Sequence, residues 1–97
     1  MLWYVYKIIT RSCHTYIGQT SNPDERFKSH KYWISRGRLG YNEIPPCEDP
    51  VIEVLCTEST EFDALIVESR FIAQDILDNT KNCNRRIGYC NSFGNPR

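Results

Sequence analysis

The sequence predicts a small α/β sandwich in which two helices cover a mixed or antiparallel sheet. Three segments rich in aromatic and β-branched residues have the composition of strands, and two segments with well-marked starts have the pattern of helices. These segments follow one another in the order β-β-α-β-α. A chain of 97 residues has room for one domain, taken as residues 1–97, and for one modest hydrophobic core.

The first two strands are expected to form a hairpin. Residues 3–10 are dense in aromatic and β-branched side chains, residues 11–14 form a short polar turn, and residues 15–18 return as the second strand. Alternation along the first strand places Tyr6 on the face opposite to Val5. The second strand ends at Gly18, where the backbone needs conformational freedom or another group must approach it closely.

The first helix is expected over residues 23–36. Asn22 is a strong N-cap residue, and Glu25 three positions later completes a capping box. Arg26 and His30 are four residues apart and therefore project from one face of this helix. Because a helix N-terminus carries partial positive charge, this region suits a phosphate, although a solvated helix face is the plain alternative.

The segment after this helix is expected to be irregular until a third strand begins. Residues 37–50 contain two glycines and three prolines, which favour an irregular connection. Residues 51–57 are apolar enough to form a strand at or near the centre of the sheet.

Within the first helix, Phe27 and Ile34 mark the buried stripe because they are seven residues apart.

The second helix has the clearest pattern in the chain. Thr60 with Asp63 three positions later makes another capping box. Glu68 lies on the shoulder of the expected buried face, where a carboxylate is partly desolvated. From residue 79 onward the chain is expected to lie on the surface as loop. The positions expected to face the core are Phe62, Leu65, Ile66, Ser69, Ile72, Ala73, Ile76 and Leu77.

The formal net charge is zero, which argues against a protein that coats nucleic acid non-specifically. The charge is unevenly distributed, at +5 over residues 1–40, −9 over residues 41–80 and +4 over residues 81–97. An anionic partner is therefore expected to meet the two ends of the chain rather than its middle.

The cysteines favour a reducing compartment. The five cysteines are odd in number and include no C-x-x-C pair, so free thiols are expected rather than disulfides or a zinc site. The N-terminus lacks the features of a signal peptide, and no apolar run is long enough to cross a membrane. The expected location is the cytoplasm.

In their order and spacing, the polar residues of these elements resemble those of the GIY-YIG nuclease family. The resemblance spans about residues 3–88. Taken singly, each residue has an ordinary explanation, such as a packing tyrosine, a surface glutamate or a satisfied helix histidine. The matching segments are residues 4–6 in place of Gly-Ile-Tyr, residues 16–18 as Tyr-Ile-Gly, Arg26 with His30 as Arg-x-x-x-His, Glu68 with Ile72 as the acidic helix, and Asn84 as the late asparagine.

The resemblance implies a three-stranded, mainly antiparallel sheet flanked by helices, and hydrolysis of DNA phosphodiester bonds with one divalent cation, Mg²⁺ or Mn²⁺. Glu68 would be the metal ligand, because one carboxylate with waters and phosphate oxygens is a common Mg²⁺ arrangement. Arg26 would grip the phosphate and oppose charge that develops in the transition state.

The resemblance also implies that a tyrosine, either Tyr6 or Tyr16, accepts the proton of the attacking water. An ordinary tyrosine pKa of ~10 would have to be lowered by nearby cations, such as Arg26, Lys7 or the metal. His30 could orient or relay the proton. Asn84 would position the phosphate or the tyrosine. The residues expected to contact DNA are Lys7, Gly18, Lys28, Lys31, Arg85 and Arg86.

The sequence departs from the family pattern at several places. Tyr4 replaces the first glycine, Gln19 stands where many relatives have a lysine, and Asn82 competes with Asn84 as the late asparagine. No appended DNA-binding domain is expected, so specificity would come from the domain itself, from a homodimer or from a partner protein. The compact size fits a phage or a mobile element.

Two other functions fit parts of the sequence. A non-catalytic module for DNA binding or protein interaction would keep the nuclease fold alone, in line with the neutral net charge and the changes at Tyr4 and Gln19. A zinc-stabilised adaptor would use Cys83 and Cys90 with Cys13 and His14.

Overall fold

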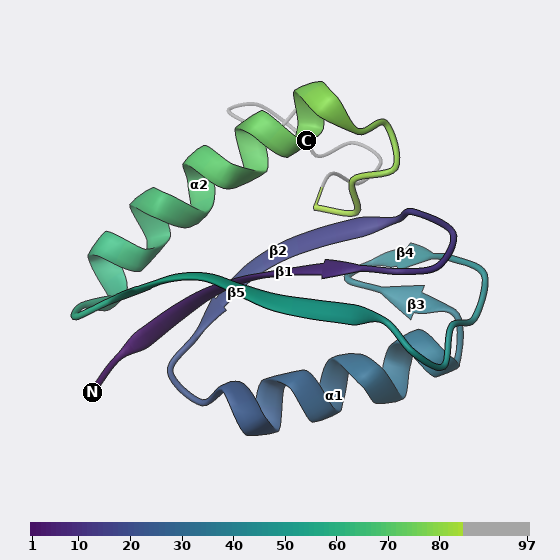
Figure 1. Cartoon of the computed structure of the whole chain (residues 1–97), viewed down its shortest axis with the longest axis horizontal. Helices are drawn as coiled ribbons and strands as arrows, with labels where there is room; N and C mark the ends of the chain where they lie inside the picture. The colour runs from purple at the N-terminus through teal and green to yellow at the C-terminus, as the bar shows by residue number, and fades with distance from the viewer. Residues whose placement is uncertain (85–97) are drawn as a thin grey trace.

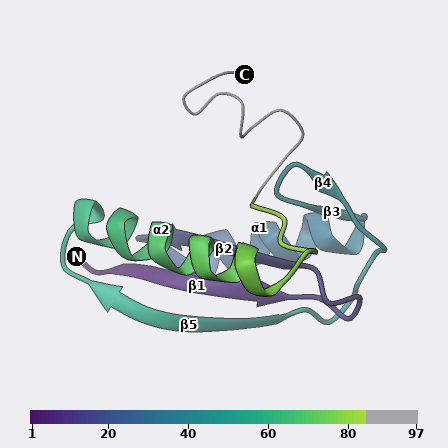
Figure 2. The ribbon, with the colours of Figure 1, turned by 90° about the horizontal axis from the view of Figure 1, so that it is seen from above.

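The computed structural model describes residues 1–84 and confirms the expected α+β fold, with the main elements in the order β-β-α-β-α. A three-stranded antiparallel sheet has the order β2-β1-β5, and the two helices lie on its opposite faces (Figures 1 and 2). The bounds are β1 (Trp3–Ile9), β2 (Thr15–Thr20), α1 (Pro23–Ser35), β5 (Val51–Glu58) and α2 (Glu61–Asp78).

The central strand is β1, which pairs with both neighbours. Its side chains alternate as expected, so that Tyr6 and Ile8 face the α1 side while Val5 faces the α2 side. The expectation that the third strand would be central is wrong, because β5 pairs with β1 alone and forms an edge of the sheet. Val51 and Val54 on β5 are accordingly 57% and 46% exposed, and an apolar composition did not distinguish this edge from the centre.

The pairing of β1 with β5 contains an irregularity beside Tyr6. Val5 lies opposite Cys56, whereas Tyr6 lies opposite Val54, so Leu55 is an extra residue on β5. An extra residue of this kind bends a strand and redirects neighbouring side chains, and it is frequent next to active sites. The bulge thus falls beside Tyr6, one of the residues that the sequence nominates for catalysis.

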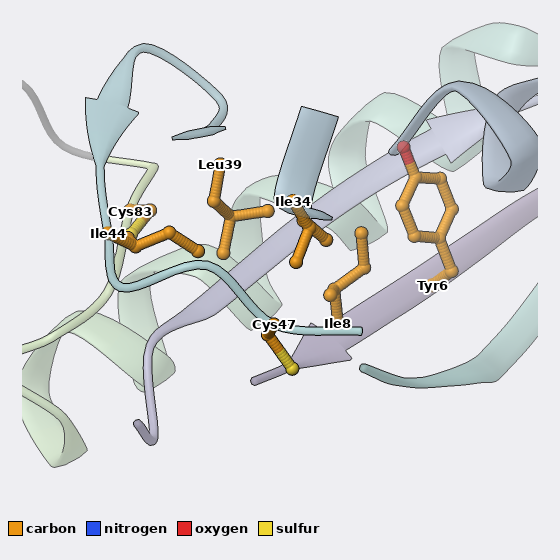
Figure 3. Close-up of a cluster of buried hydrophobic side chains, with 7 residues drawn as sticks. All are labelled: Tyr6, Ile8, Ile34, Leu39, Ile44, Cys47 and Cys83. Atoms are coloured by element: carbon orange, nitrogen blue, oxygen red, sulfur yellow. The ribbon is translucent and has the colours of Figure 1, made fainter. Parts of the chain in front are cut away.

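A small hairpin replaces the irregular connection that the sequence predicts after α1. Strands β3 (Arg38–Leu39) and β4 (Asn42–Glu43) pair with each other. Gly37 and Gly40 make this possible, because their φ values of +87° and +64° lie in the left-handed region that side chains disfavour. The hairpin contributes to a buried cluster on the α1 side of the sheet, whose members are Tyr6, Ile8, Ile34, Leu39, Ile44, Cys47 and Cys83 (Figure 3).

Helix α1 begins and packs as the sequence predicts. The Asn22 side chain accepts a hydrogen bond from the Glu25 amide at 3.4 Å, which satisfies one of the free N–H groups of the first turn. Ile34 is fully buried, and Phe27 packs against the same cluster. The stripe expected from residues seven apart is therefore the stripe that contacts the sheet.

Helix α2 also begins as predicted, with the Thr60 hydroxyl accepting from the Asp63 amide at 3.1 Å. Of its expected buried face, Ile72 does pack against the core, but most of the other positions are exposed. Phe62 and Leu77 are 71% and 81% exposed, whereas Ala64 is fully buried. The small alanine allows the helix to approach the sheet closely, and this sets a rotation that turns much of the apolar stripe toward solvent. Apolar spacing alone favours the larger side chains and therefore predicts the wrong face.

Residues 81–84 are not free surface loop but line the outer edge of β2. Thr15 forms an isolated parallel bridge with Asn82, and the Cys83 amide donates to the Thr15 carbonyl at 2.6 Å. The Asn84 side chain binds the Ile17 backbone twice, accepting from its amide at 2.8 Å and donating to its carbonyl at 2.7 Å. This edge of the sheet is thereby closed by the end of the described chain.

A buried carboxylate on α2 anchors this closed edge. Asp75 accepts hydrogen bonds from the Thr15 hydroxyl at 2.5 Å and from the Asn82 amide at 2.6 Å, and Lys7 lies 3.2 Å away as an ion pair. Burial by itself would raise the pKa of Asp75, but these hydrogen bonds and the Lys7 charge together hold the pKa below its ordinary value. Asp75 is thus an ionised structural residue that joins α2 to both strands of the hairpin.

Two further sequence expectations can be compared with residues 1–84. Cys13, Cys47, Cys56 and Cys83 are free thiols, and Cys90 lies outside this range. No helix within residues 1–84 is both long enough and apolar enough to span a membrane.

Candidate active site

The site is centred on a hydrogen bond between two elements. The hydroxyl of Tyr6 on β1 lies 2.8 Å from Nε2 of His30 on α1. Tyr6 is only 1% exposed, and its ring meets the edges of Phe27 and His30 at centroid distances of 5.1 and 5.5 Å. These ring contacts hold the phenol so that its hydroxyl meets one nitrogen of the imidazole.

Tyr16 on β2 brings a second phenol to the same place. It is half-buried, and its ring lies 5.2 Å from that of His30, centroid to centroid. Gly18, which lies opposite Tyr6 in the strand pairing, leaves the necessary space. A Cβ atom on Gly18 would lie 2.5 Å from the Tyr6 hydroxyl and 3.1 Å from the Tyr16 ring, so any side chain there would displace a phenol.

Opposite charges from the two helices act on these phenols. Arg26 on α1 is exposed, and Glu68 comes from α2 on the other face of the sheet and is half-buried. Desolvation raises the pKa of Glu68, and the Arg26 guanidinium opposes that rise. The expectation that Glu68 is partly desolvated is therefore confirmed, and its charge is close enough to act on both tyrosines.

Both tyrosines are weaker acids than free tyrosine. Burial raises the pKa of Tyr6, with a further rise from Tyr16 and Glu68, and Arg26 lowers it only in part. Burial likewise raises the pKa of Tyr16, followed by the Glu68 charge, again against Arg26. In the protein alone, neither phenol has the lowered pKa that a base requires at neutral pH, so an additional positive charge is needed.

His30 is a neutral imidazole at physiological pH. Desolvation and then the neighbouring Arg26 charge lower its pKa to about 4. A neutral imidazole can accept a hydrogen bond from the Tyr6 hydroxyl at Nε2 when its proton resides on Nδ1. His30 is therefore able to accept the hydrogen bond that the Tyr6 hydroxyl donates.

Comparison with known families places the chain in one of them. The model of the GIY-YIG catalytic domain matches residues 2–74, about three quarters of the chain. The chain belongs to the GIY-YIG catalytic domain family. It is therefore an enzyme of a phosphodiester hydrolase family with nuclease-type activity, for which a DNA substrate is implied. No curated protein and no solved structure gave a significant match.

GIY-YIG enzymes typically use a divalent cation. The residues of this site fit a cation that is held by few protein ligands. Within residues 1–84, no group of three or more His, Cys, Asp or Glu side chains is placed to hold a metal. Glu68 offers a partly desolvated carboxylate beside two phenols whose pKa values are raised. One carboxylate completed by water and phosphate oxygens is an arrangement that suits Mg²⁺ or Mn²⁺ better than a softer metal such as zinc.

The structure brings together five of the six residues that the sequence nominated for catalysis, and the sixth lies apart from them. Tyr6, Tyr16, Arg26, His30 and Glu68 act on one another electrostatically or by contact. Both polar atoms of the Asn84 amide are instead engaged with Ile17, one residue from Tyr16. Asn82 is buried with its side chain bonded to Asp75, whereas the side chain of Asn84 binds the backbone of β2 directly.

The residues nominated for DNA contact are scattered. Lys7 pairs with Asp75 on the α2 side of the sheet rather than facing Tyr6, so it is not one of the cations that lower the pKa of the phenol. Gly18 faces the phenols. Lys28 and Lys31 are exposed on α1. Arg85 and Arg86 lie outside the described residues.

The sequence reading missed an aromatic cluster on α1 and a neighbour of Tyr16. Tyr32 and Trp33 contact each other, and the Arg36 guanidinium lies 4.2 Å from the centroid of the Tyr32 ring. The spacing of four residues between Tyr32 and Arg36 is a signal that could have indicated this stack. Tyr41, in the β3–β4 turn, is close enough to Tyr16 to raise its pKa, a proximity that the sequence does not indicate.

Proposed function

We propose that the protein is a divalent-cation-dependent DNA endonuclease in which Tyr6, supported by His30, activates the attacking water. The observation that carries the proposal is the Tyr6–His30 hydrogen bond of 2.8 Å, set between the charges of Arg26 and Glu68. Phosphodiester hydrolysis needs an activated water, charge stabilisation at the phosphoryl group and assistance to the departing oxygen. The family match supports the reaction class, and the geometry suggests how the work is divided.

Tyr6 is the better candidate for the base because its hydroxyl has a partner that can receive its proton. As the water gives a proton to the Tyr6 oxygen, Tyr6 shifts its own proton along the hydrogen bond to Nε2 of His30. Because the pKa of His30 is low, that proton then leaves to solvent and the imidazole is neutral again. The water oxygen then bonds to phosphorus while the bond to the departing oxygen breaks, and that oxygen takes a proton from solvent. The ring of Tyr16, half-buried with its centroid 5.2 Å from that of His30, helps to hold the imidazole in place.

Arg26 is suited to the phosphoryl oxygens. Its guanidinium is exposed, and it borders an open hollow of about 300 Å³ that Thr20, Asn22, Glu25 and Ser29 also line. A planar fork of donors binds two phosphate oxygens at once and stabilises the negative charge that develops on them. Arg26 also lowers the pKa of both tyrosines, so one residue assists both the base and the phosphate.

Glu68 would hold the divalent cation, Mg²⁺ or Mn²⁺. Its raised pKa reflects desolvation that no cationic partner fully offsets, and a bound cation would relieve that cost. When bound, the cation would supply charge stabilisation to the phosphoryl and departing oxygens and a positive potential at the phenols. The negative charge of the site thus comes from Glu68 on α2, and its positive charge comes from Arg26 on α1.

The test is a plasmid cleavage assay with mapping of the cut ends. Wild-type protein with Mg²⁺ should nick or cut the plasmid, and chelator or Glu68→Gln should abolish cutting. Tyr6→Phe should lower the rate by about 10²–10⁴-fold, which is the usual contribution of a general base. Tyr4→Phe, a change of the same kind two residues earlier on β1, is the matched control and should leave the rate unchanged.

Two results would contradict the proposal. Unchanged cutting by Glu68→Gln would remove the metal-holding role. DNA binding without cutting under Mg²⁺ and Mn²⁺ would favour the alternative of a non-catalytic binding module. That alternative draws on one observation, the Gln19 amide oxygen, which is buried without a hydrogen-bond partner within residues 1–84 at the position where many relatives have a lysine.

A further inference from the structure

Helix α1 carries two large aromatic side chains that the core does not use. Tyr32 and Trp33 are each 50% exposed. Their rings meet edge to face, with centroids 5.1 Å apart and an angle of 88° between their planes. The Arg36 guanidinium lies 4.2 Å from the centre of the Tyr32 ring, as a cation–π contact. These three residues are called the aromatic patch below.

The aromatic patch continues the catalytic face of the helix. Trp33 is three residues after His30 and seven after Arg26, so all three lie along neighbouring rows of α1. Seven residues of helix span ~10 Å. At ~3.4 Å per stacked nucleotide, this is about the length of three nucleotides from a phosphate at Arg26. A strand bound at Arg26 that follows the helix axis therefore reaches Trp33.

The low net charge of the molecule makes base stacking an important source of affinity for DNA. The formal net charge is zero, and two of the lysines are already bonded within the fold, Lys7 to Asp75 and Lys81 to the Ser12 carbonyl. Attraction to phosphates, which supplies most non-specific affinity for duplex DNA, is therefore weak. Stacking on aromatic rings supplies affinity without net charge, and arginine beside a ring adds to it.

We propose that the aromatic patch of Tyr32, Trp33 and Arg36 binds unpaired bases next to the phosphate held at Arg26. The proposal rests on the nuclease function proposed above and names its substrate class, which is DNA with unpaired nucleotides rather than continuous duplex. In a duplex, both faces of each base are already stacked on neighbours, so the ring of Trp33 has no base face to cover. Single strands, flaps and junctions present free base faces.

The first test observes Trp33 directly. The chain has two tryptophans, so Trp3→Phe leaves Trp33 as the only one. With chelator present to prevent cutting, a short oligothymidylate should quench the fluorescence of Trp33 in a saturable way, because a stacked base quenches indole. A blunt duplex of the same length should quench much less at equal concentration. Equal quenching by duplex, or no quenching by the single strand, would overturn the proposal.

The second test measures affinity. Trp33→Ala should raise the Kd for the oligothymidylate about five- to a hundredfold, the range expected for one lost base stack. Alanine is favourable in a helix, so α1 should remain folded, and circular dichroism verifies this. Trp33→Phe should retain most of the affinity. Phe62→Ala removes a 71% exposed aromatic residue from α2 and should leave the Kd unchanged.

These measurements separate the two proposals because binding is read without turnover. If Trp33 is quenched by single strands but no divalent cation supports cutting, the aromatic patch stands and the hydrolytic mechanism falls. If plasmid or flap DNA is cut and Trp33→Ala binds and cuts like wild type, the mechanism stands and the aromatic patch is wrong.

Discussion

At Gly18, a missing side chain sets the geometry of the two phenols. The glycine lies opposite Tyr6 in the hairpin, and a Cβ atom there would lie 2.8 Å from the ring carbon that bears the Tyr6 hydroxyl. The ring cannot easily yield, because Phe27 and His30 contact it at their edges. The last residue of the Tyr-Ile-Gly motif is therefore explained by the close approach of Tyr6.

Gly18→Ala should lower cleavage more than it lowers stability. We expect a loss of about 1–3 kcal/mol in the free energy of unfolding from overpacking, and a large loss of activity because the Tyr6 hydroxyl is moved from His30. Denaturant unfolding and the plasmid assay measure the two effects. Tyr6→Phe in the same background removes the closest atom, so the double variant should be less destabilised than the sum of the single changes. Simple additivity would contradict the contact.

The pKa of His30, lowered to about 4, can also be tested. Its folded-state pKa lies below the ~6.5 of the unfolded chain, so between these values the unfolded state binds the proton and the folded state does not. Stability should therefore fall as the pH decreases from about 6.5 to about 4.

Titration of the histidine ring signals by nuclear magnetic resonance checks this, with His14 as the internal comparison. The His30 signal should keep its neutral position to about pH 5. His30→Gln should remove a pH-dependent component of stability on the order of 2 kcal/mol, allowing for the partial exposure of the ring. An imidazole that protonates near pH 6.5 would contradict the buried, neutral assignment.

At the scale of elements, the outer edge of β2 depends on a segment that follows α2. Asn84 supplies both a donor and an acceptor to Ile17, and Asp75 fastens Thr15 and Asn82 from the helix. An unpaired edge strand presents free N–H and C=O groups, which proteins commonly cover. Covering this edge holds the strand that carries Tyr16 at the position required by the site.

Asn84→Ala should loosen β2 without touching the catalytic side chains. Losing two hydrogen bonds to a part-buried backbone should cost about 1–3 kcal/mol. Amide hydrogen exchange should show reduced protection at Ile17 while the α1 amides are unaffected. Asn79→Ala is a matched control, because Asn79 bonds to Cys13 and Thr15 at the other end of the strand and not to Ile17. Unchanged protection at Ile17 would contradict this role for Asn84.

For the molecule as a whole, the arrangement of charge limits how it can hold DNA. We expect a strand that runs from Arg26 along the aromatic patch to meet mainly exposed arginines, namely Arg26, Arg36 and Arg38. Lys7 is occupied by Asp75. The acidic middle of the chain, at −9 over residues 41–80, contains the whole of α2 and β5. DNA should therefore approach from the α1 side, with few phosphates neutralised.

The affinity for single-stranded DNA should depend weakly on salt. With about three phosphate contacts, log K should fall with log[salt] at a slope of about −2. Fluorescence anisotropy with a labelled oligothymidylate between about 50 and 200 mM salt measures the slope. Arg26→Gln should reduce its magnitude by about one contact. A slope steeper than about −4 would mean that cations outside this group, such as Lys28, Lys31, Arg85 and Arg86, carry the binding.

The sequence alone determined the five main elements and their order, because the signals for these are local. It also nominated the residues of the centre. The caps at Asn22 and Thr60 depend on contacts three residues away, and both are present as predicted. The grouping of Tyr6 with Arg26, His30 and Glu68 followed from a family pattern spread along the chain. The match over residues 2–74 confirms the family from which that pattern was taken.

Only the tertiary structure decided the rotation of α2, the edge position of β5 and the partners of Lys7 and Asn84. Each of these depends on which surfaces meet, and an apolar stripe or a lysine does not specify its partner. Ala64 brings α2 close to the sheet and exposes Phe62, and Asp75 takes the lysine that the sequence had assigned to the phenols. Packing between distant segments therefore converted a list of catalytic residues into a centre in which Tyr6 and His30 share one hydrogen bond.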